Sequence, residues 1–101
     1  MARFDLYRVE GWRIPLMVDV QTGYLDELAT RVVIPLRQLE AAPDSPIPRL
    51  KPVLILSTGH YVLETPDLGS LPLIGLGSPV GNIAEHRDSI TAALDFLLQG
   101  F

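Results

Sequence analysis

Short apolar runs separated by turn-forming residues make up most of the chain. All nine prolines precede residue 80, and the apolar runs between them are about five residues long. This spacing is typical of several short strands in a small barrel or sandwich. The predicted strands, which are rich in β-branched and aromatic residues, cover residues 4–9, 16–21, 31–36, 53–57, 61–65 and 71–76.

Two local signals refine this strand pattern. Thr58 and Gly59 separate the fourth run from the fifth by a tight connection, which predicts a β-hairpin with His60 beside its turn. Three prolines within residues 41–48 remove backbone donors and fix φ. That stretch fits neither a sheet nor a helix, so it is predicted to be an exposed loop.

The long stretch without glycine or proline, residues 82–99, predicts one C-terminal helix. Asn82 and Glu85 have the spacing of a capping box at its start. Gly100 stands where a helix-ending residue takes a left-handed conformation. The apolar residues recur at helical period: Ile83, Ile90, Leu94, Leu97 and Phe101. The expected fold class is therefore mainly β with one C-terminal α-helix.

Composition narrows the class of protein. The chain has 101 residues, 48% of them hydrophobic, and no cysteine, so we expect a single domain over residues 1–101 without disulfides or thiolate metal ligands. The net charge of −4 opposes a phosphate-binding surface, because such surfaces need a cationic excess. Charges interrupt the N-terminal region, and no apolar run approaches the roughly 20 residues that cross a bilayer. We expect a soluble, cytoplasmic protein without membrane contact.

Catalytic and metal-binding patterns are missing from the sequence. His60 and His86 have no carboxylates at metal-ligand spacing around them. The glycines between Gly75 and Gly81 lack the spacing of a phosphate loop, and Pro79 removes an amide that an anion would need. No serine lies in a Gly-x-Ser-x-Gly elbow. We therefore expect no catalytic residue, no metal and no cofactor.

Several short motifs, taken in order, resemble the CcdB family of toxins. The motifs are Phe4-x-x-Tyr7, Val18-Asp19-Val20-Gln21, Val33-Ile34-Pro35-Leu36, Leu50-x-Pro52-Val53, Leu71-Pro72-Leu73, His86-Arg87 and Gly100. They extend over essentially the whole chain. The resemblance implies an SH3-like small β-barrel of the CcdB/MazF type, closed by a C-terminal helix.

The resemblance also implies a function. CcdB-like proteins are homodimeric toxins of bacterial type II toxin–antitoxin modules. They poison DNA gyrase, a topoisomerase, by binding its A subunit and trapping the cleaved-DNA complex, and they perform no covalent chemistry. A cognate CcdA-like antitoxin neutralises the toxin through a disordered segment, and the two together repress transcription of the operon. DNA would then be contacted only indirectly, through the toxin–antitoxin complex.

The residues that correspond by position to the family's gyrase-binding residues fall into two segments. They are Thr22, Tyr24 and Leu25 in a loop, and Asp95, Gln99, Gly100 and Phe101 at the helix end. Gln99 stands where the family usually has a tryptophan, and such aromatic anchors commonly carry about 2 kcal/mol or more of an interface. Asp95 replaces the usual asparagine. We expect Phe101 to serve as the apolar anchor instead.

We expect arginine side chains to bind the antitoxin. Seven of the eight basic residues are arginines, which suit bidentate contacts with carboxylates. The candidate antitoxin-binding residues are Arg8, Arg13 and Arg49, in or beside the first turn and the proline-rich loop. Trp12, in the same turn, is expected to cover one end of the barrel.

Two other functions fit the same barrel. A MazF-like endoribonuclease toxin shares the architecture, but acidity and the lack of an evident basic groove oppose it. A non-toxic homologue that binds only the antitoxin is favoured by Gln99. For any of these functions, a chain with only 20% charged residues favours a homodimer, because one small barrel leaves apolar surface uncovered.

Overall fold

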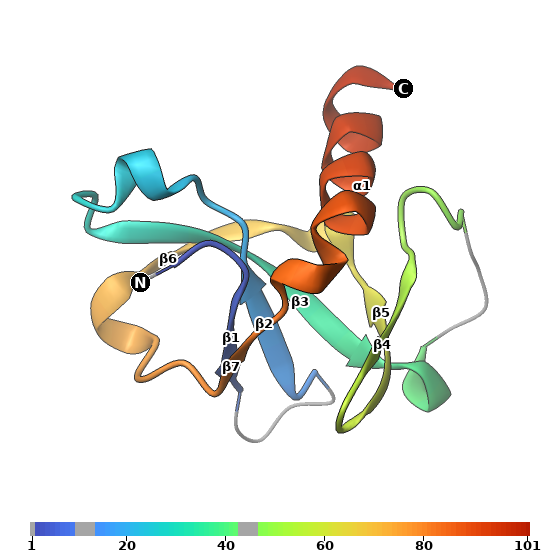
Figure 1. Ribbon diagram of the computed structural model, residues 1–101, viewed down its shortest axis with the longest axis horizontal. Helices are drawn as coiled ribbons and strands as arrows, with labels where there is room; N and C mark the ends of the chain where they lie inside the picture. The colour runs from blue at the N-terminus through green and yellow to red at the C-terminus, as the bar shows by residue number, and fades with distance from the viewer. Residues whose placement is uncertain (1, 10–13, 43–46) are drawn as a thin grey trace.

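A computed structural model describes residues 2–9, 14–42 and 47–101. Within these ranges, strands form one antiparallel sheet and an α-helix follows them near the C-terminus (Figure 1). The elements are β1 (Asp5–Arg8), β2 (Leu16–Asp19), β3 (Thr30–Gln38), β4 (Val53–Leu56), β5 (Gly59–Leu63), β6 (Gly69–Pro72), β7 (Gly81–Asn82) and α1 (Arg87–Gln99). The predicted class, mainly β with one C-terminal helix, is confirmed.

The long strand β3 organises the sheet. The strand order is β4-β5-β3-β2-β1-β7, and β6 also pairs with β3. The N-terminal part of β3 pairs with β6, and its C-terminal end pairs with β5. Because the right-handed twist accumulates along such an order, the sheet curls into an antiparallel half-barrel. This curled sheet agrees with the small-barrel architecture expected from the sequence.

The core lies on the concave side of the sheet, beneath α1. Alternate strand residues such as Val18, Ile34 and Leu36 are fully buried there. The helix contributes Ile90 and Ala93, both buried, to the same cluster. The predicted apolar stripe is thus buried at the start of the helix but ends in exposed residues, and Ala93 extends the buried face. Burial of Ile90 and Ala93 in this core, rather than helix propensity alone, holds α1 in place.

The predicted start of the helix is confirmed only in part, since Asn82 accepts an amide of the first helical turn but the α-helix itself begins at Arg87. Asn82 belongs to β7, where its Nδ2 donates to the Asp5 carboxylate over 2.9 Å and its Oδ1 accepts from the Ala84 N–H over 3.0 Å. A 3₁₀ turn, Ala84–His86, then precedes α1, so Asn82 and Glu85 form no capping box at the start of the α-helix. The cause is tertiary, because the asparagine side chain joins the β1–β7 edge. The predicted helix end at Gly100 is confirmed by its left-handed φ of 82°.

Other strand predictions shift by a few residues. The sixth strand ends at Pro72, and a 3₁₀ turn, Leu73–Gly75, replaces its predicted second half. The hairpin between β4 and β5 turns at Ser57 and Thr58, while Gly59, with φ of 147°, is already the first residue of β5. The two-residue strand β7 was not predicted, since two residues carry no periodic signal. Residues 43–46 of the proline-rich stretch lie outside the described residues.

A buried ion pair lies between β2 and β3. The Arg31 Nε donates to Asp19 Oδ2 over 2.7 Å, and a second guanidinium nitrogen donates to Asp19 Oδ1 over 3.0 Å. Both side chains are at most 1% exposed. The hydrogen bonds that Arg31 donates to Asp19 raise the pKa of Arg31 further above its usual value, so the guanidinium stays charged. Burial, together with the charges of Asp5 and Asp19, raises the pKa of the neighbouring Tyr7.

Replacing Asp19 by asparagine should strongly destabilise the protein. Asp19→Asn preserves the shape of the side chain but leaves the buried Arg31 charge without its main partner. Breaking a buried pair in this way costs about 3–5 kcal/mol of the free energy of unfolding, measurable by urea denaturation.

Asp26→Asn is the matched control. Asp26 pairs with the same guanidinium over 3.0 Å, but its side chain is 53% exposed. Its loss should cost no more than about 1 kcal/mol. Equal effects of the two variants would contradict the assignment of the buried pair as the dominant interaction.

Candidate partner-binding site

The C-terminal end of α1 presents an exposed apolar tip. Phe101 and Leu98 are 74% and 72% exposed. Gly100 ends the helix in the left-handed conformation and redirects the last residue away from the helical path. Gln99, directly before Gly100, donates from Nε2 to Asp95 Oδ1, one helical turn earlier, over 3.4 Å. The end of the chain therefore offers an aromatic ring and a leucine to solvent beside a polar pair.

The second predicted segment is a 3₁₀ turn, Gly23–Leu25. Thr22 caps this turn, because its Oγ1 accepts from the Tyr24 N–H over 3.3 Å. Tyr24 is 97% exposed, and Leu25 is about half exposed. The turn projects from the end of β2 and carries an aromatic side chain that makes almost no contact with the rest of the fold.

Two buried polar contacts fasten this turn to the sheet. The Gln21 side chain donates from Nε2 to the Leu25 carbonyl over 3.1 Å and accepts from the Val32 N–H over 3.0 Å. Arg31, which pairs with Asp19, also reaches Asp26 immediately after the turn. Tyr24 is thus exposed but positioned, because the backbone on both sides of it is tied to buried groups.

Sequence reasoning did not assign a supporting role to Gln21, Asp19 or Arg31. A signal was present, since Asp19 and Gln21 interrupt an apolar strand that lies within a family motif. The arginine that completes the cluster lies twelve positions after Asp19. Local pattern gives no reason to pair these two residues rather than others.

The two predicted gyrase-binding segments lie apart within one chain. In Figure 1 the turn between β2 and β3 lies at the upper left, whereas the C-terminal end of α1 is at the top right. The fold itself therefore does not join Tyr24 and Phe101 in one continuous patch.

The three candidate antitoxin-binding arginines have different surroundings. Arg8 is exposed at the end of β1 and lines a cleft. Arg49 lies with its guanidinium carbon 4.7 Å from the centre of the Phe96 ring, which places it against α1. Arg13 and Trp12 lie outside the described residues. In Figure 1 the end of β1 and the segment before β4 are well separated, so Arg8 and Arg49 belong to different parts of the surface.

Within residues 2–9, 14–42 and 47–101, no three side chains of His, Cys, Asp or Glu gather as metal ligands. No helix in that part of the chain has the length and apolar character needed to cross a bilayer.

Comparison with known families decides the class of protein. A family model described as CcdB protein matches residues 3–100. The chain belongs to the CcdB family. Its members are toxins of toxin–antitoxin systems that poison gyrase, and they are not a catalytic family. The motifs that resembled CcdB thus mark membership over nearly the full length. In this CcdB-family chain, the exposed tail and the Tyr24 turn stay the predicted gyrase-binding positions.

Removing the Gln21 amide should loosen the Tyr24 turn. In Gln21→Leu, the Leu25 carbonyl loses its donor and the Val32 N–H loses its acceptor. We expect faster hydrogen exchange at the amides of residues 24, 25 and 32, and a loss of about 1–3 kcal/mol in the free energy of unfolding.

Thr22→Val serves as the control, because it removes only an exposed cap. Its free energy of unfolding should fall by about 1 kcal/mol or less, without faster exchange at residue 32. Unchanged exchange at all three amides in Gln21→Leu would contradict the supporting role of Gln21.

Proposed function

We propose that this chain is the toxin of a type II toxin–antitoxin module that inhibits DNA gyrase by binding its A subunit and trapping the cleaved-DNA complex. The family match over residues 3–100 carries the proposal. The toxin acts in the cytoplasm as a homodimer of one CcdB-like domain, residues 1–101. A CcdA-like antitoxin neutralises it, and the complex represses the operon, so the toxin itself need not contact DNA.

Phe101 is the anchor on gyrase in this proposal. Aromatic residues that enter a partner's pocket carry a large share of the binding energy. Phe101 and Leu98 are the large exposed apolar side chains at this end of α1. Gln99, in place of the family's usual tryptophan, is hydrogen-bonded to Asp95. The hydrophobic contact with gyrase is therefore displaced from position 99 to position 101.

Exposed apolar surface supports the homodimer. Tyr24, Leu25, Leu28 and Ile74 are each at least 46% exposed. An apolar hollow of about 300 Å³ also opens on the described surface, lined by Val9, Ile14, Met17, Pro35 and Leu71. Where exposed apolar residues gather in a patch, they often mark an interface with another protein. A two-fold interface would cover part of it.

Deleting the tail should abolish toxicity. Removal of residues 98–101 takes away Leu98, Gln99, Gly100 and Phe101 but leaves the buried Ile90 and Ala93 in place. Induced expression of the full chain should arrest bacterial growth and accumulate gyrase-cleaved DNA, whereas the truncated chain should do neither.

Sedimentation and circular dichroism of the truncated chain provide the control, since both should match the full chain. Phe101→Ala should weaken gyrase binding by about 2 kcal/mol or more, and Ser89→Ala, on an exposed part of α1, should have no effect. Full toxicity after the deletion would refute the role of the tail.

The cationic residues are proposed to hold the antitoxin. Reversing two charges in Arg13→Glu with Arg49→Glu should weaken antitoxin binding at least tenfold, about 1.4 kcal/mol, because attraction to carboxylates becomes repulsion. Calorimetric titration at two salt concentrations measures the change. Arg3→Gln, which removes a cation that packs on Phe4, is the control and should leave the affinity unchanged. An unaltered affinity in the doubly reversed variant would reject these arginines as antitoxin contacts.

The same expression experiment distinguishes the two other functions. A MazF-like endoribonuclease would arrest growth with cleaved RNA and intact DNA. A non-toxic homologue that binds only the antitoxin would not arrest growth at all, and Gln99 is the observation that favours it.

A further inference from the structure

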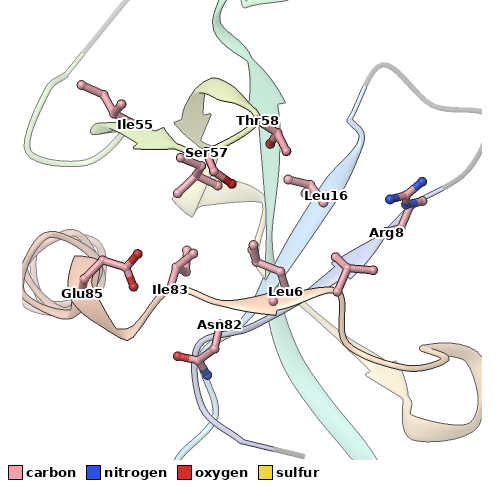
Figure 2. Close-up of a pocket in the computed structure, with 12 residues that line it drawn as sticks. Leu6, Arg8, Leu16, Ile55, Ser57, Thr58, Asn82, Ile83 and Glu85 are labelled. Atoms are coloured by element: carbon pink, nitrogen blue, oxygen red, sulfur yellow. The ribbon is translucent and has the colours of Figure 1, made fainter.

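A cleft separates the two edges of the curled sheet. The strand order ends at β4 on one side and at β7 on the other. The cleft between them has a volume of about 260 Å³. In Figure 2, Ile55, Ser57 and Thr58 lie along one side, Asn82, Ile83 and Glu85 along the opposite side, and Leu6 and Leu16 lie between them. The half-barrel therefore has an open seam with an apolar floor.

The β4 side of this seam has unpaired backbone groups. The Pro52 carbonyl accepts from the Leu63 N–H over 3.0 Å, so Pro52 and Leu63 form a hydrogen-bonded pair. In an antiparallel ladder such pairs alternate with pairs that are not hydrogen-bonded, so the register of β4 and β5 shows which residues face outward. Val53 and Ile55 then occupy the positions whose N–H and C=O point away from β5. Among the described residues, neither of these N–H groups has an acceptor, while the Ile55 carbonyl lies 3.2 Å from His86 Nε2.

The β4 edge lacks three common protections against strand addition, although it is short and His86 contacts its Ile55 carbonyl. Natural edge strands are blunted by lysine, proline or a bulge. The sequence of β4 is Val-Leu-Ile-Leu, without charge or proline. The outward side chains of Val53 and Ile55 are 49% and 64% exposed. Such an edge is a template for another extended chain.

Charged residues mark the two ends of the seam. Figure 2 shows Arg8 at one end and Glu85 at the other. Neither has an ion pair with another described residue. A second hollow of about 260 Å³ shares Arg8, Leu16 and Thr58, so the groove continues past the arginine. The seam thus matches an apolar segment with a carboxylate near one end and a cation near the other.

A second copy of the chain fits this seam poorly. Its own β4 with its flanks, residues 49–58, carries Arg49 and Lys51 but no carboxylate to meet Arg8. In the second copy, β4 also faces residues 81–85 of that same copy, which line the opposite side of its cleft. A single extended segment brings no such wall with it.

The geometry points to strand addition at β4, with an extended segment of the antitoxin as the occupant. The segment lies in the seam as an added strand that hydrogen-bonds to Val53 and Ile55, with a carboxylate on Arg8 and a cation on Glu85. The identity of the occupant rests on the proposed function. The location of the binding edge rests on the backbone register and the charges alone.

Synthetic peptides test the edge directly. The probe is a labelled peptide of about eight residues, of alternating valine and threonine, with glutamate at one end and lysine at the other. It should bind the full chain and protect the amide protons of Val53 and Ile55 from hydrogen exchange. The two control peptides carry two glutamates or two lysines and should bind at least about threefold more weakly, since one end is then repelled. Absence of binding, or protection elsewhere on the sheet, overturns the inference.

Ile55→Pro blocks the edge without breaking the β4–β5 ladder, because the N–H that it removes points outward. Binding of the glutamate–lysine probe should fall at least about tenfold, since a hydrogen bond is lost and the proline ring obstructs the approach. Ile55→Ala, which keeps the N–H, should stay within about threefold of the unsubstituted chain. Equal losses in both variants would mean that the side chain, not the edge, holds the peptide, and would overturn strand addition.

Charge reversal identifies the two ends. Arg8→Glu should shift the preference to the peptide with two lysines, and Glu85→Lys to the peptide with two glutamates, each by about tenfold. An unchanged order of affinities in both variants refutes the charge assignment. If Ile55→Pro instead dissociates the homodimer in sedimentation, the edge belongs to a second copy and the proposed occupant is wrong.

Growth assays keep this inference distinct from the proposed function. Ile55→Pro should arrest growth as the unsubstituted chain does, but co-expressed antitoxin should no longer rescue it. Rescue equal to that of the unsubstituted chain overturns the seam as the antitoxin site while the gyrase proposal stands. If the unsubstituted chain fails to arrest growth, the gyrase proposal is refuted. Protection of the Val53 and Ile55 amides from hydrogen exchange by the peptide would still support the open edge.

Discussion

The Arg31–Asp19 ion pair is the interaction on which the arrangement of the sheet and of the Tyr24 turn depends. A guanidinium buried to 1% exposure is tolerable only because Asp19 meets it with two hydrogen bonds and Asp26 adds a third. Those partners come from β2 and from the segment leading into β3. The charge therefore favours one relative position of the two strands, since any slip would leave a buried charge unpaired.

This ion pair also helps to fix the position of the Tyr24 turn. Asp19 also accepts the Gln21 N–H over 2.9 Å, and Gln21 in turn binds both the turn and β3. Tyr24 can be almost fully exposed while its backbone is held in place, because the buried side chain of Gln21 hydrogen-bonds to the turn and to β3. The C-terminal tail is held differently, by apolar packing of Ile90 and Ala93 and by the left-handed Gly100. A preorganised turn and a short tail leave few residues to be ordered on binding, which lowers the entropic cost of binding a partner.

The same curled sheet leaves its two outer edges facing one another without joining them. His86 contacts the Ile55 carbonyl across the gap, but the remaining outward N–H groups of β4 are unpaired among the described residues. The toxin surfaces argued for gyrase and for the antitoxin are thus different in kind: one is a projecting apolar tip, the other an open backbone edge between opposite charges. Occupying one need not obstruct the other within a single chain.

Local sequence determined the class of each element and the residues at several of its ends. The strand runs, the hairpin near Thr58 and the helix end at Gly100 were predictable because each depends on neighbours within a few positions. The resemblance to the family also predicted the tail and the Tyr24 turn as gyrase-binding positions. The start of α1 was mispredicted by several residues, because Asn82 also bonds to Asp5, 77 positions away, and belongs to β7. The pairing of Arg31 with Asp19, the support from Gln21 and the seam between β4 and β7 were decided only by tertiary structure. Each of these three features joins residues that are brought together by burial of the common core. A local sequence pattern cannot show which distant residues the folded core brings into contact.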